Sequence, residues 1–315
     1  MSASFVIALA ILLGLLFFLY QQVRKTAWPI AIGETPRRPK SRWRVFFATI
    51  PAVIAALVIW AFSIEPNRLV VRHQTIQIDE WPKELSGIRI AVISDIHAGS
   101  RFIDDDKLRL IVRRTNELQP SLIVILGDYV TGRGRDTHPP ERFALILKDL
   151  NAPLGVYSVL GNHDWWFDGK RVREALEANG IRVLDDESTE LRLPTGSFWL
   201  VGLADLWTRP QRIEPTIAQI PQGRPIIAIT HNPDIFPRLP QRVPLLLAGH
   251  THGGQVRFPL IGTVVQASDY GERYVRGHVF EQNHHLFVTT GIGTSIVPVR
   301  LSVPPEIVLL TIESQ

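Results

Sequence analysis

Two long apolar runs dominate the beginning of the chain. Residues 2–20 and 45–64 contain no charged side chain and are almost wholly hydrophobic. A hydrocarbon layer about 30 Å thick is crossed by about 20 residues of α-helix. The pattern therefore predicts a membrane module, residues 1–64, with two transmembrane helices. A cleaved signal peptide is the alternative for the first run, but the basic segment that normally precedes the apolar part of such a peptide is missing.

Beyond an expected linker over residues 65–86, strand-like runs alternate with helical patterns. GIRIAVIS, SLIVILGD and GVYSVLGNHD are typical of buried strands, whereas residues 104–118, 140–150 and 170–178 have helical spacing, with Asp104 as an N-cap. From residue 181 onward short strands dominate, including STELRL, SFWLVGLA, PIIAITH and PLLLAGH. This order predicts one α/β domain over residues 87–315, in which two packed, mixed β-sheets are flanked by helices.

Charge is distributed unevenly between these two parts. Residues 1–64 hold seven of the 34 Lys and Arg residues but one of the 30 acidic residues, which leaves 27 basic and 29 acidic side chains in the remainder. The larger domain has no basic excess, so nucleic acid is not an expected partner. All seven basic residues of the membrane module lie between its two apolar runs, and the positive-inside rule places such a loop in the cytoplasm. We therefore expect a multi-pass cell-membrane protein, with lipid bilayer as a partner and the larger domain outside the cytoplasm.

Polar side chains that can bind metal ions follow five of the predicted apolar strands. Neighbouring strand ends share one rim of a sheet sandwich, so residues far apart in the sequence can meet there. Taken singly, each group has an ordinary explanation as a turn former or a core histidine. Their recurrence at five strand ends favours one shared site. The groups are Asp95 with His97, Asp128, Asn162 with His163 and Asp164, His231, and His250 with His252.

The stretch GHTHGGQ indicates what kind of site to expect. Along an extended chain residues i and i+2 share a face, so His250 and His252 should point the same way, and the glycines let the backbone approach whatever the rings bind. The chain has no cysteine, which excludes thiolate ligands and disulfides. Carboxylates, an amide and imidazoles suit two divalent ions such as Mn, Fe or Zn. Asp128 is the natural carboxylate to bridge two ions.

The order of these motifs, D-x-H, GD, GNHD, H and GHTH, resembles that of the calcineurin-like metallophosphoesterases over about residues 87–315. With the two apolar runs, the chain looks most like the membrane-associated bacterial phosphodiesterase branch. The resemblance implies hydrolysis of a phosphoester bond by a hydroxide that bridges two divalent ions, without a covalent enzyme intermediate. It also implies two ligand sets that share one residue: Asp95, His97, Asp128 and His252 for one ion, and Asp128, Asn162, His231 and His250 for the other.

The same resemblance implies catalytic roles for His163 and Asp164. His163 would contact the phosphoryl group and stabilise or protonate the leaving oxygen, and Asp164 would fix the His163 ring. One position departs from the pattern, because Thr131 stands where many relatives have an acid shortly after the GD block. Arg133 and Arg135 in the same loop could approach a substrate phosphate or could simply be solvated.

Aromatic residues near the GNHD block bear on the substrate. Trp165, Trp166 and Phe167 follow the block directly, and Trp207 lies in a second loop. They could hold a lipid-linked phosphoester at the membrane surface, or they could be core and lid packing. Two alternatives to a membrane-anchored phosphoesterase stay open. One is a non-catalytic scaffold that binds metal or lipid, and the other is a cytoplasmic-facing hydrolase similar to the UDP-2,3-diacylglucosamine hydrolases.

Overall fold

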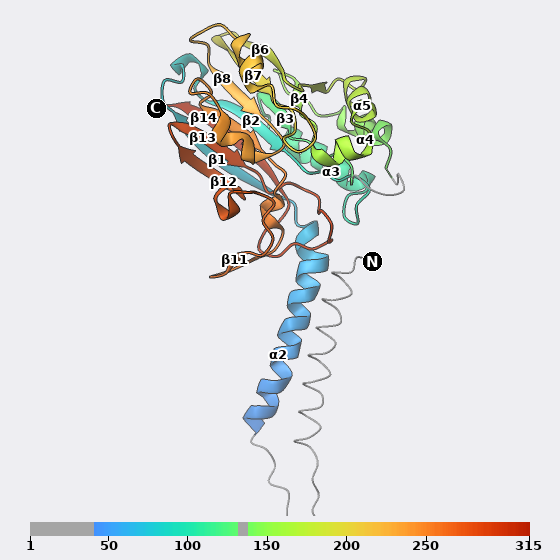
Figure 1. Cartoon of the computed structure of the whole chain (residues 1–315). Helices are drawn as coiled ribbons and strands as arrows, with labels where there is room; N and C mark the ends of the chain where they lie inside the picture. Colours follow the sequence, from blue (N-terminus) through green and yellow to red (C-terminus); the bar gives the residue numbers. More distant parts are fainter. Residues whose placement is uncertain (1–40, 132–137) are drawn as a thin grey trace, which may run out of the picture. The chain divides into compact units, whose positions relative to one another are not determined.

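The computed structural model describes residues 41–131 and 138–315, with side chains described from residue 49 onward (Figure 1). Backbone contacts divide the chain into two compact units, Met1–Ile64 and Glu65–Gln315. The division falls at the residue where the second apolar run of the sequence ends.

Helix α2 (Ser41–Ile59) forms most of the described part of the smaller unit and continues into a π-helical turn at Trp60–Ile64. The described segment Thr49–Asn67 is long and apolar enough to cross a membrane, judged by length and composition alone. It overlaps the second span expected over residues 45–64. The first expected span, residues 2–20, and most of the basic loop lie outside the described residues, so the two-span arrangement stays a prediction.

The first sheet of the larger unit has six strands in the order β1-β14-β2-β3-β4-β5. Strands β2 to β5 run parallel, whereas β14 runs antiparallel to β2 and parallel to β1, so the sheet is mixed as predicted. The strand bounds are Val70–Ile78 for β1, Ile88–Ile93 for β2, Leu122–Ile125 for β3, Val156–Ser158 for β4, Arg182–Val183 for β5 and Glu306–Ser314 for β14.

Strand β1 corrects the expected linker. Residues 65–86 are part of the folded unit, because β1 pairs with β14 along its whole length, from Val70 opposite Glu306 to Ile78 opposite Ser314. As an edge strand β1 leaves much of its length exposed, and it buries Ile76 and Ile78 near its end. Its sequence therefore reads as mostly polar and gives no apolar run to mark it.

The second sheet has the order β12-β13-β9-β8-β7-β6 and is also mixed, since β13, β9, β8 and β7 run parallel while both edge strands run antiparallel to their neighbours. A separate two-stranded hairpin, β10-β11, follows β9 in the sequence. The strand bounds are Glu187–Leu193 for β6, Gly196–Gly202 for β7, Ile226–Ile229 for β8, Leu245–Ala248 for β9, Arg257–Phe258 for β10, Gly262–Thr263 for β11, Gly277–Glu281 for β12 and His284–Val288 for β13.

The two large sheets pack face to face through a fully apolar layer. Val92 of β2 and Val308 of β14 belong to the same buried cluster as Leu247 of β9 and Phe287 of β13. A second cluster joins the outer face of the first sheet to helices α3 (Asp105–Glu117), α4 (Pro140–Leu147) and α5 (Asn162–Glu177). A third joins the second sheet to α6 (Ile213–Ala218) and a 3-10 helix at Pro233–Arg238. The predicted pair of packed sheets flanked by helices is confirmed (Figure 1).

Two helices follow their predictions closely. Helix α3 begins where expected, and the Asp104 side chain caps it by accepting a hydrogen bond from the backbone N–H of Lys107 at 2.8 Å. Helix α4 begins at Pro140 as expected and ends at Leu147, somewhat before the predicted end at Leu150.

Helix α5 differs from its prediction in a way that matters for the site. It begins at Asn162 rather than Lys170, because the Asp164 carboxylate accepts a hydrogen bond from the Gly161 backbone N–H at 2.9 Å and so caps the helix start. Asp168 has extended backbone angles, φ −169° and ψ 84°. This interruption breaks the helical periodicity, so the sequence pattern does not predict the first turn of α5. The GNHD block therefore lies in the first turn of a helix and not at the end of a strand.

Candidate metal centre

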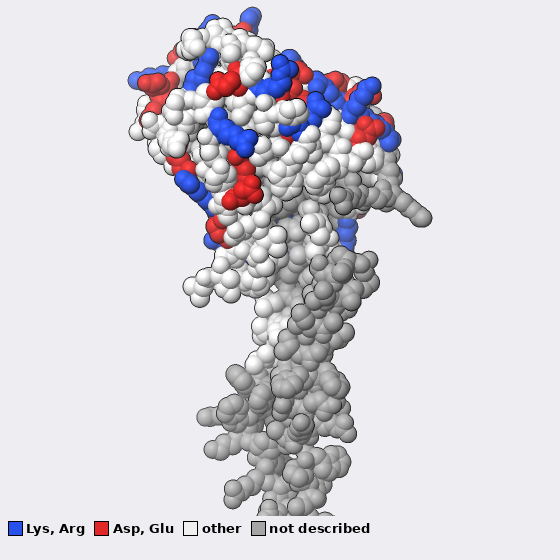
Figure 2. Space-filling view, viewed as in Figure 1, with Lys and Arg blue, Asp and Glu red and all other residues white. Residues whose placement is uncertain are grey.

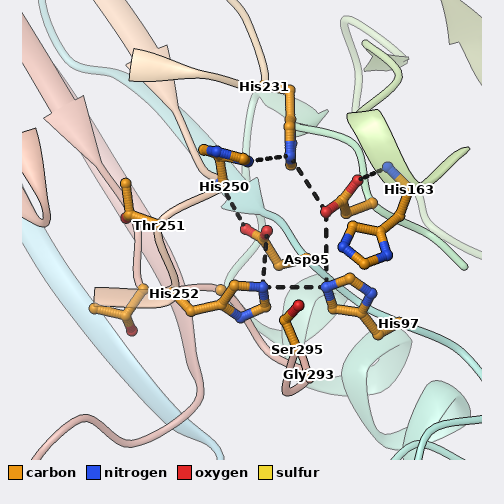
Figure 3. A network of polar contacts seen from close by, with 12 residues as sticks. Asp95, His97, His163, His231, His250, Thr251, His252, Gly293 and Ser295 are labelled. Atoms are coloured by element: carbon orange, nitrogen blue, oxygen red, sulfur yellow. Dashed lines mark hydrogen bonds and ion pairs between the residues drawn. The ribbon is translucent and has the colours of Figure 1, made fainter. Parts of the chain in front are cut away.

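Four strands from both large sheets bring their following loops to one place (Figure 3). Asp95 and His97 follow β2, Asp128 follows β3, His231 follows β8, and the GHTH loop follows β9. These strands run parallel within each sheet, so their carboxyl ends meet along one edge. The sequence-distant residues predicted to share a rim are therefore brought together, although the GNHD block reaches the site from the start of α5.

The backbone at the site adopts an uncommon conformation. The left-handed region, with φ between 47° and 69°, contains Asp95, His97, Asp128, His250 and His252. Such angles in residues other than glycine cost on the order of 1–3 kcal/mol each and persist where the surrounding structure imposes them. Gly249 shows how crowded the loop is, because a Cβ atom at this position would overlap the side chains of Ser94 and Asp95. These backbone angles let the side chains of the three loops point towards the same site.

The first group of ligand-type atoms belongs to Asp95, His97, Asp128 and His252, which are all buried and whose ligand atoms lie within 4.8 Å of one another. The Nε2 atoms of His97 and His252 are 3.1 Å apart. Asp95 Oδ1 is 3.4 Å from His252 Nε2, and Asp128 Oδ2 is 3.7 Å from His97 Nε2. Two imidazole nitrogens and two carboxylates thus face one small volume.

The second group consists of Asp128, His231 and His250, which are also all buried. His231 Nε2 lies 3.3 Å from Asp128 Oδ2 and 3.1 Å from His250 Nδ1. The same oxygen of Asp128 therefore faces both groups, while its other oxygen accepts a hydrogen bond from the His163 backbone N–H at 2.9 Å. A carboxylate in this position can bridge two ions.

Backbone carbonyls fix the tautomers of two histidines. His97 Nδ1 lies 2.8 Å from the Val130 carbonyl oxygen, and His231 Nδ1 lies 2.7 Å from the Leu126 carbonyl oxygen. A carbonyl oxygen only accepts, so Nδ1 carries the proton in each ring and Nε2 points inward. Carbonyl contacts of this kind are typical of metal-binding histidines.

Burial sets the charge state of most of the rings. It lowers the pKa of His97 to about 4 and that of His250 to about 3, and it lowers the pKa of His252 as well. These rings are therefore neutral at physiological pH, which is the form that binds metal. Burial also raises the pKa of Asp95 to about 6.

His231 and Asp128 behave as a charged pair. Burial alone would lower the pKa of His231, but the carboxylates of Asp128 and Asp95 raise it to about 10. Burial alone would raise the pKa of Asp128, yet His231 holds it well below the usual range. The site thus favours a positive charge beside the Asp128 carboxylate. A divalent ion can supply that charge in place of the His231 proton.

Two buried oxygen atoms support the fit of metal ions to this site. Among the described residues, Asn162 Oδ1 and Asp95 Oδ1, the oxygen that faces His252 Nε2, have no hydrogen-bond partner. A buried polar atom without a partner costs about 1–3 kcal/mol, and a bound metal ion would supply that partner. Asn162 is buried and precedes His163, whose backbone N–H donates to Asp128.

Asp164 does not have the partner that the sequence suggested. Its carboxylate accepts hydrogen bonds from the backbone N–H groups of Asp128 and Tyr129 at 2.8 Å and of Val130 at 3.2 Å, in addition to that of Gly161. The expected bond from the His163 ring is replaced by one from His163 Nδ1 to the Thr131 carbonyl oxygen at 2.8 Å. The reason is geometric, because the capping position turns Asp164 back towards the loop that carries Asp128. Burial and the charge of Asp128 raise the pKa of Asp164 to about 7.

The aromatic residues divide into two pairs. Trp165 and Phe167 pack against the core cluster beneath α5. Trp166 and Trp207 are 45% and 52% exposed, and their ring centroids are 6.4 Å apart. Trp207 lies 4.3 Å from the His250 ring, and Trp166 lies 5.0 Å from the His163 ring. The second pair therefore borders the metal centre on its solvent side.

Sequence reasoning missed Arg300, which is fully buried next to the centre. Its guanidinium donates to the carbonyl oxygens of Gly293 at 2.6 Å, Thr290 at 2.9 Å and Val303 at 3.0 Å. The Gly293 backbone N–H in turn donates to the Asp95 carbonyl oxygen at 2.6 Å. Arg300 thus holds the segment that supports Asp95, and no feature of its local sequence distinguishes it from a solvated arginine. Arg133 and Arg135 lie outside the described residues.

A family model described as calcineurin-like phosphoesterase matches residues 88–254, which include every predicted ligand. The chain belongs to the calcineurin-like phosphoesterase family. This phosphoesterase is 31% identical over 259 residues to the metallophosphoesterase YkuE of Bacillus subtilis (strain 168), a match that covers 81% of the chain and 89% of that protein. The predicted family and the predicted class of activity, a metal-dependent phosphoester hydrolase, are both confirmed.

Two further relatives have informative names. The Phosphodiesterase YaeI of Escherichia coli (strain K12) is 31% identical over 227 residues, which cover 70% of this phosphoesterase and 81% of YaeI. A protein of Danio rerio named "Transmembrane protein with metallophosphoesterase domain" is 29% identical over 285 residues, which cover 83% of this chain and 62% of that protein.

Proposed function

We propose that this phosphoesterase holds two divalent ions through seven side chains that share one bridging carboxylate. Support comes from the two groups of buried ligand atoms, which meet at a single oxygen of Asp128. The unpartnered amide oxygen of Asn162 supports its place beside the second group. One ion would be held by Asp95, His97, Asp128 and His252, and the other by Asp128, Asn162, His231 and His250.

Two bound divalent ions supply an activated water and offset the negative charge that develops on the phosphoryl oxygens. The chain's own part is to hold these ligands in place before the substrate arrives. Asp164 does so by accepting hydrogen bonds from backbone N–H groups of the Asp128 loop. Arg300 does so by donating hydrogen bonds to the carbonyl oxygen of Gly293, beside Asp95. Such preorganisation means that little rearrangement is needed during the reaction.

His163 is the residue we assign to the leaving group. It is half-buried in the first turn of α5, and its ring centroid lies 4.8 Å from that of His97. Because Nδ1 bonds to the Thr131 carbonyl oxygen, Nε2 is the atom available to a phosphoryl or leaving oxygen. A protonated Nε2 can donate its proton to that oxygen as the bond to phosphorus breaks.

We further propose that the substrate is a phosphodiester that bears an apolar or lipid group and is presented at the extracytoplasmic surface of the cell membrane. The two exposed tryptophans beside the metal centre support an apolar group, and the name of YaeI supports a diester. The apolar segment Thr49–Asn67 and the transmembrane relative support membrane anchorage. The basic loop of the sequence supports the extracytoplasmic location.

One panel of reactions tests the activity. The full chain, reconstituted in vesicles, is assayed against soluble mono- and diesters and against a lipid phosphodiester in the bilayer, with Mn, Fe or Zn supplied in turn. We expect metal-dependent turnover that excess chelator abolishes and added metal restores. A fully metal-loaded protein without turnover on any phosphoester would favour the scaffold interpretation. Undiminished turnover in excess chelator, with no metal in elemental analysis, would contradict the dinuclear site.

A reporter fusion tests the location. An export-dependent phosphatase reporter joined after Gln315 should be active, and a fluorescent protein that matures in the cytosol should be dark at the same position. The reverse result would favour the cytoplasmic-facing hydrolase, because nucleotide-linked lipid precursors are found on that side of the membrane.

A further inference from the structure

A hairpin outside the metal centre exposes five apolar side chains. Strands β10 and β11 pair with each other and with neither large sheet, and the segment 258–265, FPLIGTVV, carries no charge. We call its five exposed apolar side chains the apolar tip. Exposed fractions in the tip are 40% for Phe258, 109% for Leu260, 80% for Ile261, 58% for Val264 and 66% for Val265. A cluster of this kind on a folded surface marks an interaction site.

Hydrogen bonds hold the base of the hairpin in place. The Arg257 backbone N–H donates to the Leu301 carbonyl oxygen at 3.0 Å, and that of Val264 donates to the Val256 carbonyl oxygen at 3.1 Å. The Glu272 carboxylate accepts a hydrogen bond from the Thr263 backbone N–H. With its base paired in this way, the hairpin presents the tip outward from the larger unit, and Figure 1 shows it projecting beyond the sheets.

A neighbouring loop adds to the same surface. The Gln255 side-chain amide donates to the carbonyl oxygens of Ser295 at 3.1 Å and Val297 at 3.3 Å, which ties residues 295–297 to the start of the hairpin. Between them, Ile296 is 87% exposed. Figure 2 shows that uncharged atoms dominate this projecting end of the larger unit in that view.

The apolar segment of the chain joins the larger unit at the base of the same hairpin. Thr49–Asn67 ends in the larger unit, where the Glu65 carboxylate accepts a hydrogen bond from the Ser302 backbone N–H at 2.9 Å. The preceding residue, Leu301, forms two backbone hydrogen bonds with the base of the hairpin. Its N–H donates to the Gln255 carbonyl oxygen, and its carbonyl oxygen accepts from the Arg257 N–H. The point of attachment and the apolar tip therefore lie at one end of the unit.

We propose that the apolar tip inserts into the lipid interface of the bilayer that Thr49–Asn67 crosses. The proposal rests on the membrane anchorage proposed above, because the attachment point at Glu65 is what places this end of the unit next to lipid. Large aliphatic and aromatic side chains gain free energy when they move from water into the acyl boundary of a bilayer. An uncharged tip matches that environment.

Insertion would also fix the metal centre relative to the membrane. The GHTHGGQ loop leads directly into β10, and Gly254 of this loop has φ +73° and lies so close to Thr263 of β11 that a Cβ atom would overlap its side chain. The ligand His252 is thus two residues from a direct contact with the hairpin. A bilayer contact at the tip would set the height and tilt of the site above the lipid headgroups.

Because the chain has no cysteine, a single introduced cysteine can be labelled specifically. Single cysteines are introduced by Leu260→Cys in the tip, by Leu145→Cys on α4 as a matched leucine that is 55% exposed, and by Val53→Cys in α2, where the side chain is 57% exposed. Each is labelled with a fluorophore sensitive to polarity in the full chain. The proteins are reconstituted in vesicles of phosphatidylethanolamine and phosphatidylglycerol, with and without quenchers on the acyl chains.

We expect labels at positions 260 and 53 to show blue-shifted emission and several-fold stronger quenching by the acyl-chain quenchers than the label at position 145. A label at 260 that matches the one at 145, while that at 53 is quenched, would overturn insertion of the tip and leave the anchorage intact. Aqueous signals at both 53 and 260 would overturn the anchorage and the insertion together. A blue shift at 260 that disappears as the protein is diluted in lipid would mean that a second copy of the chain covers the tip, which also overturns the proposal.

Discussion

Two clusters of histidines lie at opposite ends of the second sheet, and they have different chemistry. His250 follows the last residue of β9 and faces His231 and Asp128. His285 pairs with Leu245, the first residue of β9, and its Nδ1 lies 2.8 Å from His278 Nε2. Neither metal-capable group found among the described residues includes a histidine of this second cluster.

The difference between the clusters is in their surroundings. His278 and His285 stack at 5.1 Å, and Phe280 lies 4.6 Å from the His285 ring, so this cluster packs as an aromatic group on the sheet. Burial and the neighbouring His278 lower the pKa of His285 to about 4. At the metal centre, carboxylates instead raise the pKa of His231 to about 10. A pair of close histidines becomes a metal site where carboxylates converge on it, and here strained loops at several strand ends bring them together.

The largest expected effect comes from removing the shared carboxylate. Asp128→Ala should lower turnover by more than about a thousandfold and reduce the content of both ions, because the ions that offset the charge on the phosphoryl oxygens lose their common ligand. His97→Ala and His250→Ala should each do less. Elemental analysis and the turnover rate measure the effect. His278→Ala, in the other cluster, is the control and should retain metal and activity; loss of metal there would break the distinction between the clusters.

The next effect concerns His163, the histidine proposed to act on the leaving group. His163→Ala should keep near-normal metal content and lose on the order of a hundredfold or more in turnover, the usual scale for one acid–base group. Metal loss in this variant would make His163 a ligand.

Asp164→Asn is the matched contrast to this variant. The amide replaces one carboxylate oxygen by an NH2 group, which faces either the backbone donors of Asp128 and Gly161 or those of Tyr129 and Val130 and cannot accept from them. Metal content and the melting temperature should therefore both fall. If Asp164→Asn instead kept its metal and lost turnover as His163→Ala does, the pairing of Asp164 with His163 would be the better account.

A smaller effect is expected at the aromatic border of the centre. Trp207→Ala should raise KM by about tenfold for a lipid phosphodiester in a bilayer, which corresponds to about 1.4 kcal/mol of lost contact. Turnover of a small soluble diester should change little, because such a substrate does not reach the exposed part of the ring. Trp207→Phe should restore part of the loss. Equal losses on both substrates would identify Trp207 as a packing residue over His250.

The smallest effect is on stability and belongs to the second cluster. The pKa of His285 is about 4 in the folded protein against an ordinary value of 6.5, so the unfolded chain binds the proton more tightly. Its contribution to stability is complete above about pH 6.5 and is lost as the pH falls towards 4. His285→Gln should therefore make the melting temperature fall less steeply over this window. An unchanged slope would show that His285 does not titrate in this way.

Motifs and apolar runs in the sequence were enough to predict the family, the mixed sheet sandwich and six residues that converge on the site, which are Asp95, His97, Asp128, His231, His250 and His252. The reason is that buried strands and metal ligands each require particular residue types at fixed positions, and these leave a local pattern. Strand β1 left no such pattern because it lies at a sheet edge, and the first turn of α5 left none because Asp168 interrupts the helix.

Contacts between distant segments were decided by the tertiary structure alone. The carboxylate of Asp164 is bonded to backbone N–H groups of the Asp128 loop, and the His163 ring is oriented by the Thr131 carbonyl oxygen. Arg300 binds carbonyl oxygens beside Asp95. Leu301 bonds to the base of the apolar hairpin, and the next residue, Ser302, bonds to Glu65, the first residue of the larger unit. Each of these contacts uses backbone groups, which every residue carries. The sequence therefore determines which side chains can bind metal, whereas only the folded backbone decides what holds those side chains in place.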